Sequence, residues 1–123
     1  MTKGVRIQVN SEFVPERSNP QKQEYFYSYH VTIENAGAAP VQLVSRHWII
    51  TDAFGQVEHV RGSGVVGEQP TLGPGESFEY TSACPLRTPH GSMRGSYQMV
   101  ADDGSSFDAE ISAFSLSQPQ MSN

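Results

Sequence analysis

A glycine- and proline-rich stretch, residues 62–99, constrains the fold of this chain more than any other part. It holds seven glycines and four prolines. Glycine tolerates positive φ angles, whereas proline fixes φ and removes a hydrogen-bond donor. Within this stretch, only the short run Glu76–Ala83 alternates polar and apolar residues. The stretch therefore predicts two shaped loops joined by one strand, and it leaves no room for a long helix.

Most other segments alternate apolar and polar side chains with a period of two, which is typical of half-buried strands. Tyr25, Tyr27 and Tyr29 lead the clearest of these runs, and Trp48 lies in a run that is apolar on both faces. The predicted strands are residues 5–13, 25–34, 41–51, 56–60, 76–83, 96–101 and 107–116. They predict an all-β fold, a seven- to eight-stranded antiparallel β-sandwich of immunoglobulin or fibronectin type III-like kind, with Trp48 and the tyrosines in its core.

The connections between strands predict which loops share an end of the sandwich. Asp-Gly at residues 103–104 is a strong hairpin signal. If successive strands alternate in direction, one end carries the loop Pro15–Gln23, the turn Asp52–Gly55 and the loop Pro85–Arg94. The other end then carries Asn35–Pro40, the glycine loop Gly62–Gly67 and the turn Asp102–Gly104.

The composition predicts a single domain, residues 1–123, with an ordered core of about residues 4–116 and a disordered tail at residues 117–123. The net charge of −5 argues against binding to nucleic acid. No apolar run is long enough for a signal peptide or a membrane span, so we expect no membrane insertion. Cys84 is the only cysteine, which excludes an internal disulfide and fits a cytoplasmic location. The oligomeric state stays open.

The glycine loop matches the dinucleotide-binding pattern GxGxxG through Gly62, Gly64 and Gly67. That motif works only when a helix follows, because the helix N-terminus binds the pyrophosphate. Here Pro70 and then the run Gly73–Gly75 follow, and no helix can be built from them. The pattern therefore indicates a structural loop, with an anion-binding nest as the alternative.

The sequence indicates no metal site, no cofactor and no catalytic residue. None of the four histidines has the spacing of a metal-ligand motif. Cys84 has no neighbouring base to make it a thiolate, which favours a small buried thiol over a nucleophile. Asp102, Asp103 and Asp108 lack the ligand order of a calcium loop and indicate a hairpin turn instead.

Four segments taken together resemble the ApaG family of bacterial proteins. They are RHWIITD at residues 46–52, GSGVVGEQP at 62–70, LGPGESFEYTS at 72–82 and LRTPHGSMRGSYQM at 86–99, and the likeness runs from about Val5 to Leu116. The resemblance implies a seven-stranded fibronectin-like sandwich, a link to cobalt resistance and magnesium efflux, and no assigned catalytic residues. It also implies partner recognition, because related eukaryotic domains are attached to an F-box protein and to a polymerase-interacting protein. The family's glycine motif has been discussed as a phosphate-binding feature.

We therefore expect a non-enzymatic binding module that recognises a protein partner. The cations Arg17 and Lys22 gather at the end that carries the candidate interaction surface, whose members are Arg87, Thr88, His90 and Arg94. We expect this end to meet an acidic or phosphorylated surface of the partner. The alternative is a binder or hydrolase of phosphorylated small molecules, such as a nucleotide or pyrophosphate, that uses the glycine loop.

Overall fold

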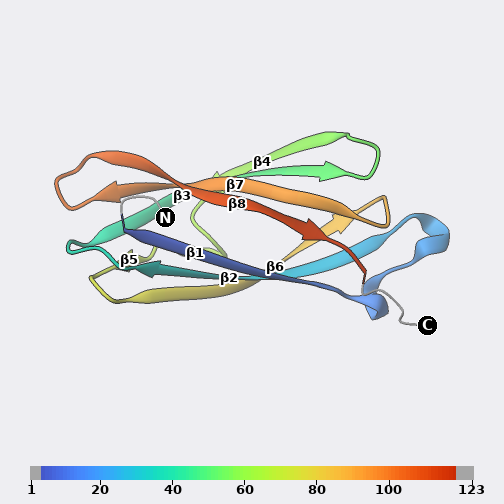
Figure 1. The fold of residues 1–123 in the computed structure, drawn as a ribbon, viewed down its shortest axis with the longest axis horizontal. Helices are drawn as coiled ribbons and strands as arrows, with labels where there is room; N and C mark the ends of the chain where they lie inside the picture. The colour runs from blue at the N-terminus through green and yellow to red at the C-terminus, as the bar shows by residue number, and fades with distance from the viewer. Residues whose placement is uncertain (1–3, 119–123) are drawn as a thin grey trace.

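The computed structural model describes residues 4–118, which form two antiparallel β-sheets without an α-helix (Figure 1). The three-stranded sheet has the order β1 (Val5–Phe13), β2 (Tyr25–Asn35), β6 (Ser77–Leu86). The five-stranded sheet has the order β4 (Val57–Ser63), β3 (Val41–Asp52), β7 (Gly91–Ala101), β8 (Ser106–Leu116), and the short β5 (Thr71–Leu72) also pairs with β3. The predicted seven- to eight-stranded antiparallel sandwich is confirmed. Most of the predicted tail, residues 119–123, lies outside the described residues.

The core lies between the two sheets and is built from the alternating residues of each strand. Tyr27, Val31 and Ile33 of β2 are fully buried, and Trp48 of β3 is 2% exposed. The Trp48 ring meets the Tyr29 ring edge-on, with 5.3 Å between the ring centroids. Trp48 and these tyrosines are therefore core residues, as the alternation predicts.

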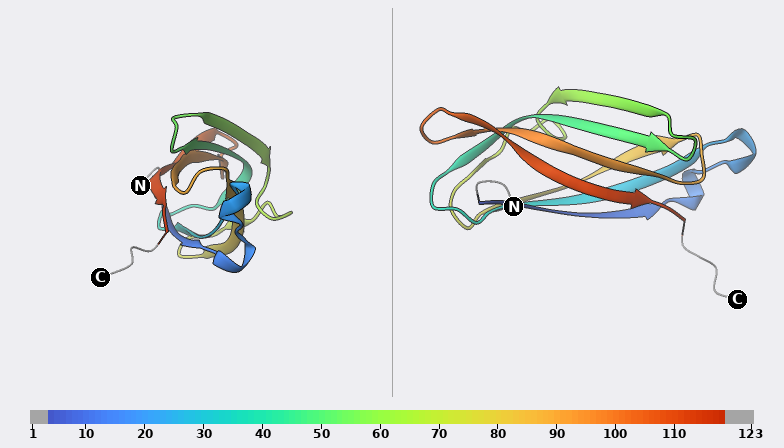
Figure 2. Two further views of the ribbon diagram at one scale, coloured as in Figure 1. Left: turned by 90° about the vertical axis from the view of Figure 1, so that its right-hand side faces the viewer. Right: turned by 45° about the horizontal axis from the view of Figure 1, so that its top comes forward.

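One long side of the sandwich is closed and the other is open. On the closed side, β1 packs against β8, and the Ser11 hydroxyl donates to the Ser115 carbonyl at 2.8 Å. On the open side, β6 and β4 are sheet edges that each pair with a single neighbour. The right panel of Figure 2 shows β4 at the far edge of the upper sheet. Within residues 4–118, therefore, no strand closes the side of the sandwich between β4 and β6.

Three connections meet at one end of the sandwich, which we call the loop end. The segment between β1 and β2 holds two 3-10 turns, Pro15–Arg17 and Pro20–Lys22. The Tyr27 hydroxyl donates to the Pro89 carbonyl, and the Ala53 N–H donates to Thr88 Oγ1 at 3.1 Å. These contacts and Figure 1 place the β1–β2, β3–β4 and β6–β7 connections together, which confirms their predicted grouping.

The predicted bounds of the third connection were wrong. Pro85 continues β6 opposite Phe26, and β7 begins at Gly91, so only residues 87–90 connect the two strands. Gly91 and Gly95 suggested a loop, but both are needed where β7 approaches β3. A Cβ on Gly95 would lie 2.1 Å from the His47 carbonyl oxygen. Close backbone approach, and not a turn, explains these glycines.

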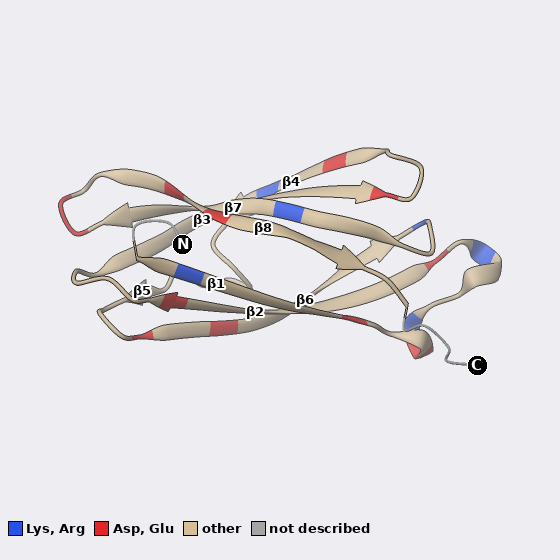
Figure 3. Ribbon diagram, in the orientation of Figure 1, with Lys and Arg blue, Asp and Glu red and all other residues tan. Residues whose placement is uncertain are grey.

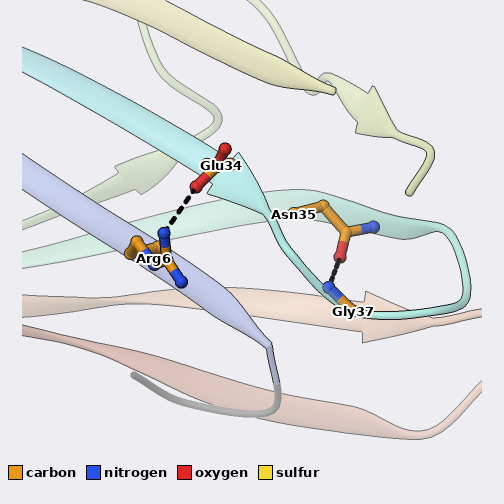
Figure 4. Close-up of polar contacts among 4 residues, drawn as sticks. All are labelled: Arg6, Glu34, Asn35 and Gly37. Atoms are coloured by element: carbon orange, nitrogen blue, oxygen red, sulfur yellow. Dashed lines mark hydrogen bonds and ion pairs between the residues drawn. The ribbon is translucent and has the colours of Figure 1, made fainter. Parts of the chain in front are cut away.

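The opposite end is tied together by Asn35, which is 1% exposed. Its Nδ2 donates to the carbonyls of Ala39 and Leu72 at 2.9 Å each, and its Oδ1 accepts the Gly37 N–H at 3.0 Å (Figure 4). The Arg6–Glu34 ion pair, 3.4 Å long, lies beside it on β1 and β2. The hairpin turn at residues 102–104 also lies at this end, as the sequence predicts.

The glycine loop does not lie at that end, contrary to the prediction. β4 and β5 both pair with β3, so the chain leaves the edge of β3 after Ser63 and rejoins the same edge at Thr71. The Gly64 N–H donates to the Val44 carbonyl at 2.8 Å, which fixes the loop beside the middle of β3. The left panel of Figure 2 shows it projecting sideways. The prediction assumed that successive strands alternate in direction, and this was wrong for β4 and β5, which run in the same direction because both are antiparallel to β3.

Candidate functional site

Two adjoining cavities form a groove along the open side of the sandwich. The outer cavity, about 930 Å³, lies at the loop end between the β1–β2 connection, the start of β4 and the end of β6. The inner cavity, about 240 Å³, continues toward the centre of β3. Ile50, Glu58 and Pro85 line both cavities, so the two form one groove. A groove of this size suits a small molecule or a segment of another protein.

The groove carries charges of both signs, and not the basic character that the sequence suggests. Figure 3 shows Lys and Arg beside Asp and Glu at the loop end. Within residues 4–118, the ion pairs are Arg6–Glu34 and His30–Glu79, both outside the groove. The charged residues of the outer cavity are Arg17, Lys22, Glu24, Asp52, Glu58 and Arg87. Since none of them forms an ion pair in the described part of the chain, their charges are available to a ligand.

Two of these residues have a local role as well. The Arg17 guanidinium lies 4.1 Å above the centroid of the Phe26 ring, which orients the 3-10 turn toward the groove. Asp52 Oδ1 accepts the N–H groups of Phe54 and Gln56 at 2.9 Å each, which closes the β3–β4 turn. Both contacts hold the rim of the groove in place.

The structure separates the four residues of the predicted interaction surface. Arg87 lines the groove, and His90 is exposed in the same connection. Thr88 is 2% exposed because its Oγ1 accepts the Ala53 N–H and its hydroxyl donates to the His90 carbonyl, so it offers no surface. Arg94 is paired with Ile49 of β3, and strand alternation places it on the outer face of the five-stranded sheet.

Arg46 is a groove residue that the sequence analysis did not identify as a candidate site residue. A β-bulge between Leu43 and Ser45 shifts the alternation of β3 and turns Arg46 to the same face as Trp48. Arg46 Nη1 donates to the carbonyls of Ser63 at 3.1 Å and Gly64 at 2.9 Å. Strict alternation from the start of β3 would have placed Arg46 on the outer face, so only knowledge of the bulge could have found it.

The glycine loop is held by its own backbone. Val65 and Glu68 exchange both N–H···O=C bonds at 2.8 and 2.9 Å, and Val66 and Gly67 between them have positive φ angles of 43° and 82°. This is a two-residue hairpin of the primed type. Gly64 also has a positive φ, 61°, and a Cβ there would lie 2.3 Å from the Glu68 carbonyl oxygen. These contacts support a structural role for Gly64 and Gly67.

Gly62, the first glycine of the motif, makes room for the side chain of Arg46. A Cβ on Gly62 would lie 2.7 Å from Arg46 Nη2, so the guanidinium packs directly against the glycine backbone. The element after the loop is β5 and not a helix, as the sequence predicts. The first glycine of the motif therefore positions Arg46 at the inner cavity.

The histidines form hydrogen bonds within the sheets. His30 Nε2 lies 2.8 Å from Glu79 Oε1, and His47 Nε2 lies 2.9 Å from His59 Nδ1 with the rings stacked. Desolvation and the nearby Arg61 guanidinium lower the pKa of His47. Within residues 4–118, no three histidine, cysteine or acidic side chains come together in a way that could hold a metal ion.

Burial keeps the Cys84 thiol of the inner cavity and two tyrosine hydroxyls of the core protonated. Burial and the Glu58 carboxylate raise the pKa of the Cys84 thiol to about 11. The hydroxyls of Tyr80 and Tyr97 are hydrogen-bonded to each other, and burial raises the pKa of both. A thiol that stays protonated at neutral pH is a weak nucleophile, and Cys84 packs as a small buried side chain.

Two packed antiparallel sheets with an open groove and a rigid loop end define a β-sandwich of the fibronectin type III-like class, a scaffold typical of recognition domains. A family model described as the ApaG domain matches residues 15–101. This chain belongs to the ApaG family.

Relatives support that assignment over nearly the whole chain. Protein ApaG of Afipia carboxidovorans is 55% identical over 121 residues, which cover 98% of this chain and 93% of the relative. Protein ApaG of Anaeromyxobacter dehalogenans strain 2CP-C is 59% identical over 119 residues, 97% of this chain and 94% of the relative. A crystal structure of a protein named ApaA from Bordetella pertussis is 50% identical, covers 95% of each chain and has a TM-score of 0.92. Among residues 4–118, no helix has the length and apolar character needed to cross a membrane.

Proposed function

We propose that this domain is a non-enzymatic binding module that recognises a protein partner through the groove on its open side. The observation that carries the proposal is the set of charged residues that line the groove without ion pairs of their own. A partner segment with complementary charges would satisfy them. Charged groups arranged this way contribute to specificity and to the rate of association.

Exposed apolar side chains beside the groove favour a protein as the partner. Phe54 is 84% exposed and Val57 is 55% exposed, and both belong to the β3–β4 connection or the start of β4 at the loop end. Large apolar side chains ringed by polar groups are typical of protein interaction sites. A small phosphorylated ligand would gain little from them.

The edge of β6 offers the backbone groups that an extended segment of a partner would need. Phe26 O accepts the Val14 N–H on the β1 side of β2. The Phe26 backbone therefore faces β1, and alternation along β2 gives Ser28, His30 and Thr32 the same orientation. The β6 residues paired with these four form no backbone hydrogen bonds to them, so their own backbone groups face the free edge of β6. Those residues are Glu79, Thr81, Ala83 and Pro85. Such an edge is a template for strand addition.

The glycine loop offers less to the alternative of a phosphate binder or hydrolase. The N–H groups of Gly64, Val65 and Glu68 already donate within the protein. Hydrolysis would also need a nucleophile with a base or a metal in one pocket. In the part of the chain that the structure describes, the groove brings together a protonated thiol and unpaired charges, which suits binding.

The link to cobalt resistance and magnesium efflux comes from the family resemblance. A module of this kind would affect Co²⁺ or Mg²⁺ through the protein that it binds. In this proposal the ions need no site on the chain itself, and the location is cytoplasmic.

The proposal is tested on a partner captured by affinity purification from the native cell. Arg17→Glu with Arg87→Glu reverses two unpaired groove cations, and we expect the Kd for that partner to rise at least ~10-fold, mainly through slower association. Added salt should weaken wild-type binding in the same direction. Arg61→Glu, on the outer face of β4 opposite His47, is the matched control. Equal binding by all three proteins would refute the groove as the interface.

A further inference from the structure

We propose that the inner cavity of the groove binds a carboxylate side chain of the partner segment, and that Arg46 is the residue that holds it. This inference rests on the proposed function, because it names the chemical group that the groove recognises. The occupant is an extended segment of a partner protein that carries a glutamate or an aspartate. The argument starts from the free donors of Arg46.

The Arg46 guanidinium is fixed in position but only partly used. Nη1 donates to the carbonyls of Ser63 and Gly64, and the planar group packs against Gly62. Among the described residues, Nη2 and Nε of Arg46 have no hydrogen-bond partner. A guanidinium whose orientation is already set loses little entropy on binding, and its donor fork matches a carboxylate.

A second unpaired donor lies on the same strand. Trp48 is two residues from Arg46 on the same face of β3, and it also lines the inner cavity. Its Nε1–H is the buried side-chain polar atom that lacks a hydrogen-bond partner within residues 4–118. Buried donors normally have partners, so an orphan at the wall of a cavity calls for an acceptor from outside or a small shift that brings one. Each of these donors can be satisfied by an oxygen acceptor.

The shape and the remaining lining of the cavity select one side chain with a single negative charge. A volume of about 240 Å³ is below the usual range for a whole small-molecule ligand. Ile50, Val60 and Met93 supply apolar walls for a short aliphatic stem. Among residues 4–118, Arg46 is the one cation that lines the cavity, whereas a phosphate dianion would need more positive charge to offset its loss of water.

Glu58 sets the position of the carboxylate. It pairs with Ile50 on β3 and lines both cavities, four residues along β4 from Gly62. At ~3.3 Å per residue, it lies about 13 Å from the place where Arg46 packs. Glu58 would repel an acidic group at the junction of the two cavities, so the carboxylate is favoured only at the inner end.

The free edge of β6 can deliver such a side chain. Ser82, Ala83 and Cys84 line the inner cavity from the opposite sheet. A segment that adds to the β6 edge beside Thr81 and Ala83 would direct every second side chain toward the inner cavity. One acidic residue in an otherwise apolar and β-branched segment is therefore the expected signature of the partner.

The single tryptophan makes the test direct, because the indole N–H gives one nuclear magnetic resonance signal, that of Trp48. The probes are a blocked five-residue peptide of valine and threonine with a central glutamate, the same peptide with glutamine, free butanoate, and inorganic phosphate. We expect the glutamate peptide to shift the Trp48 signal saturably and to bind at least ~10-fold more tightly than the glutamine peptide. Arg46→Met should abolish that difference, whereas Arg61→Met, on the outer face, should keep it.

Several results would overturn the inference. Equal shifts from the glutamate and glutamine peptides on the wild-type protein would do so even if Arg46→Met failed to fold. Tighter binding of butanoate than of the peptide would make the ligand a free acid, and tighter binding of phosphate would make it a phosphate. If both peptides shift the signals of Arg17 and Arg87 but not that of Trp48, the groove stands as the interface and only the carboxylate site fails.

Discussion

The glycine loop and the groove lie next to each other on the open side of the sandwich, but they differ in whether their polar groups already have partners within the protein. In the loop, Gly64, Val65 and Glu68 donate their N–H groups to carbonyls of the protein, and Val65 is 1% exposed. In the groove, seven charged side chains line the two cavities without an ion pair among the described residues.

The difference shows that a conspicuous motif need not be a binding site. Glycines attract attention because they are rare in strands, yet here they solve problems of chain geometry. The residues with unused binding capacity, such as Arg46 and Glu58, are unremarkable in the sequence. The loop contributes to the site indirectly, since Gly62 leaves room for the Arg46 guanidinium.

The largest expected effect on the free energy of unfolding is that of a substitution in the glycine loop. Gly64→Ala should lower the free energy of unfolding by about 3 kcal/mol or more, because it combines a positive φ with a Cβ 2.3 Å from the Glu68 carbonyl oxygen. Gly67→Ala is the control, because φ is positive there but a Cβ would meet nothing within 4 Å, so about 1 kcal/mol is expected. Urea denaturation measures both. Equal losses would mean that the contact with Glu68 does not constrain the loop.

The groove wall should respond to alkaline pH. Burial raises the pKa of the Cys84 thiol from its ordinary value of 9.0 to about 11 in the folded protein, so above pH 9 the unfolded chain loses a proton that the folded chain keeps. Stability therefore falls as the pH rises from 9 to 11, by about 3 kcal/mol in total at ~1.4 kcal/mol per unit of pKa.

Cys84→Ala tests this account of the pH dependence. The variant should make the decline between pH 9 and pH 10 shallower without removing it, because the buried tyrosines, whose ordinary pKa is 10.0, begin to contribute in the same range. Thermal unfolding of both proteins at several pH values gives the comparison. A decline of the same slope in the variant would assign the effect to other groups.

A substitution at the tip of the glycine-loop hairpin should stabilise the protein. Val66 has a φ of 43°, which is unfavourable for a β-branched residue, and its side chain is 58% exposed. Val66→Asn should raise the free energy of unfolding by about 1 kcal/mol, since asparagine accepts this conformation readily. If the variant is instead less stable, the Val66 side chain has a packing role. If it binds the partner less well while stable, the loop belongs to the interface and the contrast with the groove fails.

The smallest effect on stability is expected at the rim of the groove. Lys22→Ala and Arg87→Ala should each change the free energy of unfolding by less than about 0.5 kcal/mol, because both are exposed and neither forms an ion pair in the described part of the chain. Guanidinium denaturation measures the change. A decrease in the free energy of unfolding above about 1 kcal/mol would show that these side chains stabilise the fold and are therefore not free to bind a ligand.

The strands could be predicted from the sequence because alternation reports burial directly. The run from Tyr25 to Ile33 has its apolar face inward in the structure, and Trp48 is in the core as expected. Turn chemistry was equally reliable at Gly104, where φ is 86° in the hairpin between β7 and β8. Local rules suffice where the constraint itself is local.

Features that depend on neighbouring strands could not be predicted. A glycine such as Gly95 normally weakens a strand, but here it lies inside β7, where the close approach of the His47 carbonyl leaves no room for a side chain. The bulge after Leu43 decides whether Arg46 faces the groove, and no local pattern marks it. The position of the glycine loop depends on two strands sharing one edge of β3. Each of these is a relation between segments far apart in the chain.

Amide hydrogen exchange in the free protein and in the complex with its captured partner tests the central claim most directly. The backbone N–H groups of Glu79, Thr81 and Ala83 face the free edge of β6, so exchange there should be fast in the free protein and slow in the complex. The N–H groups of Gly64, Val65 and Glu68 are already hydrogen-bonded and should exchange at the same rate in both. Protection confined to the glycine loop, with the β6 edge unchanged, would contradict the groove as the binding site.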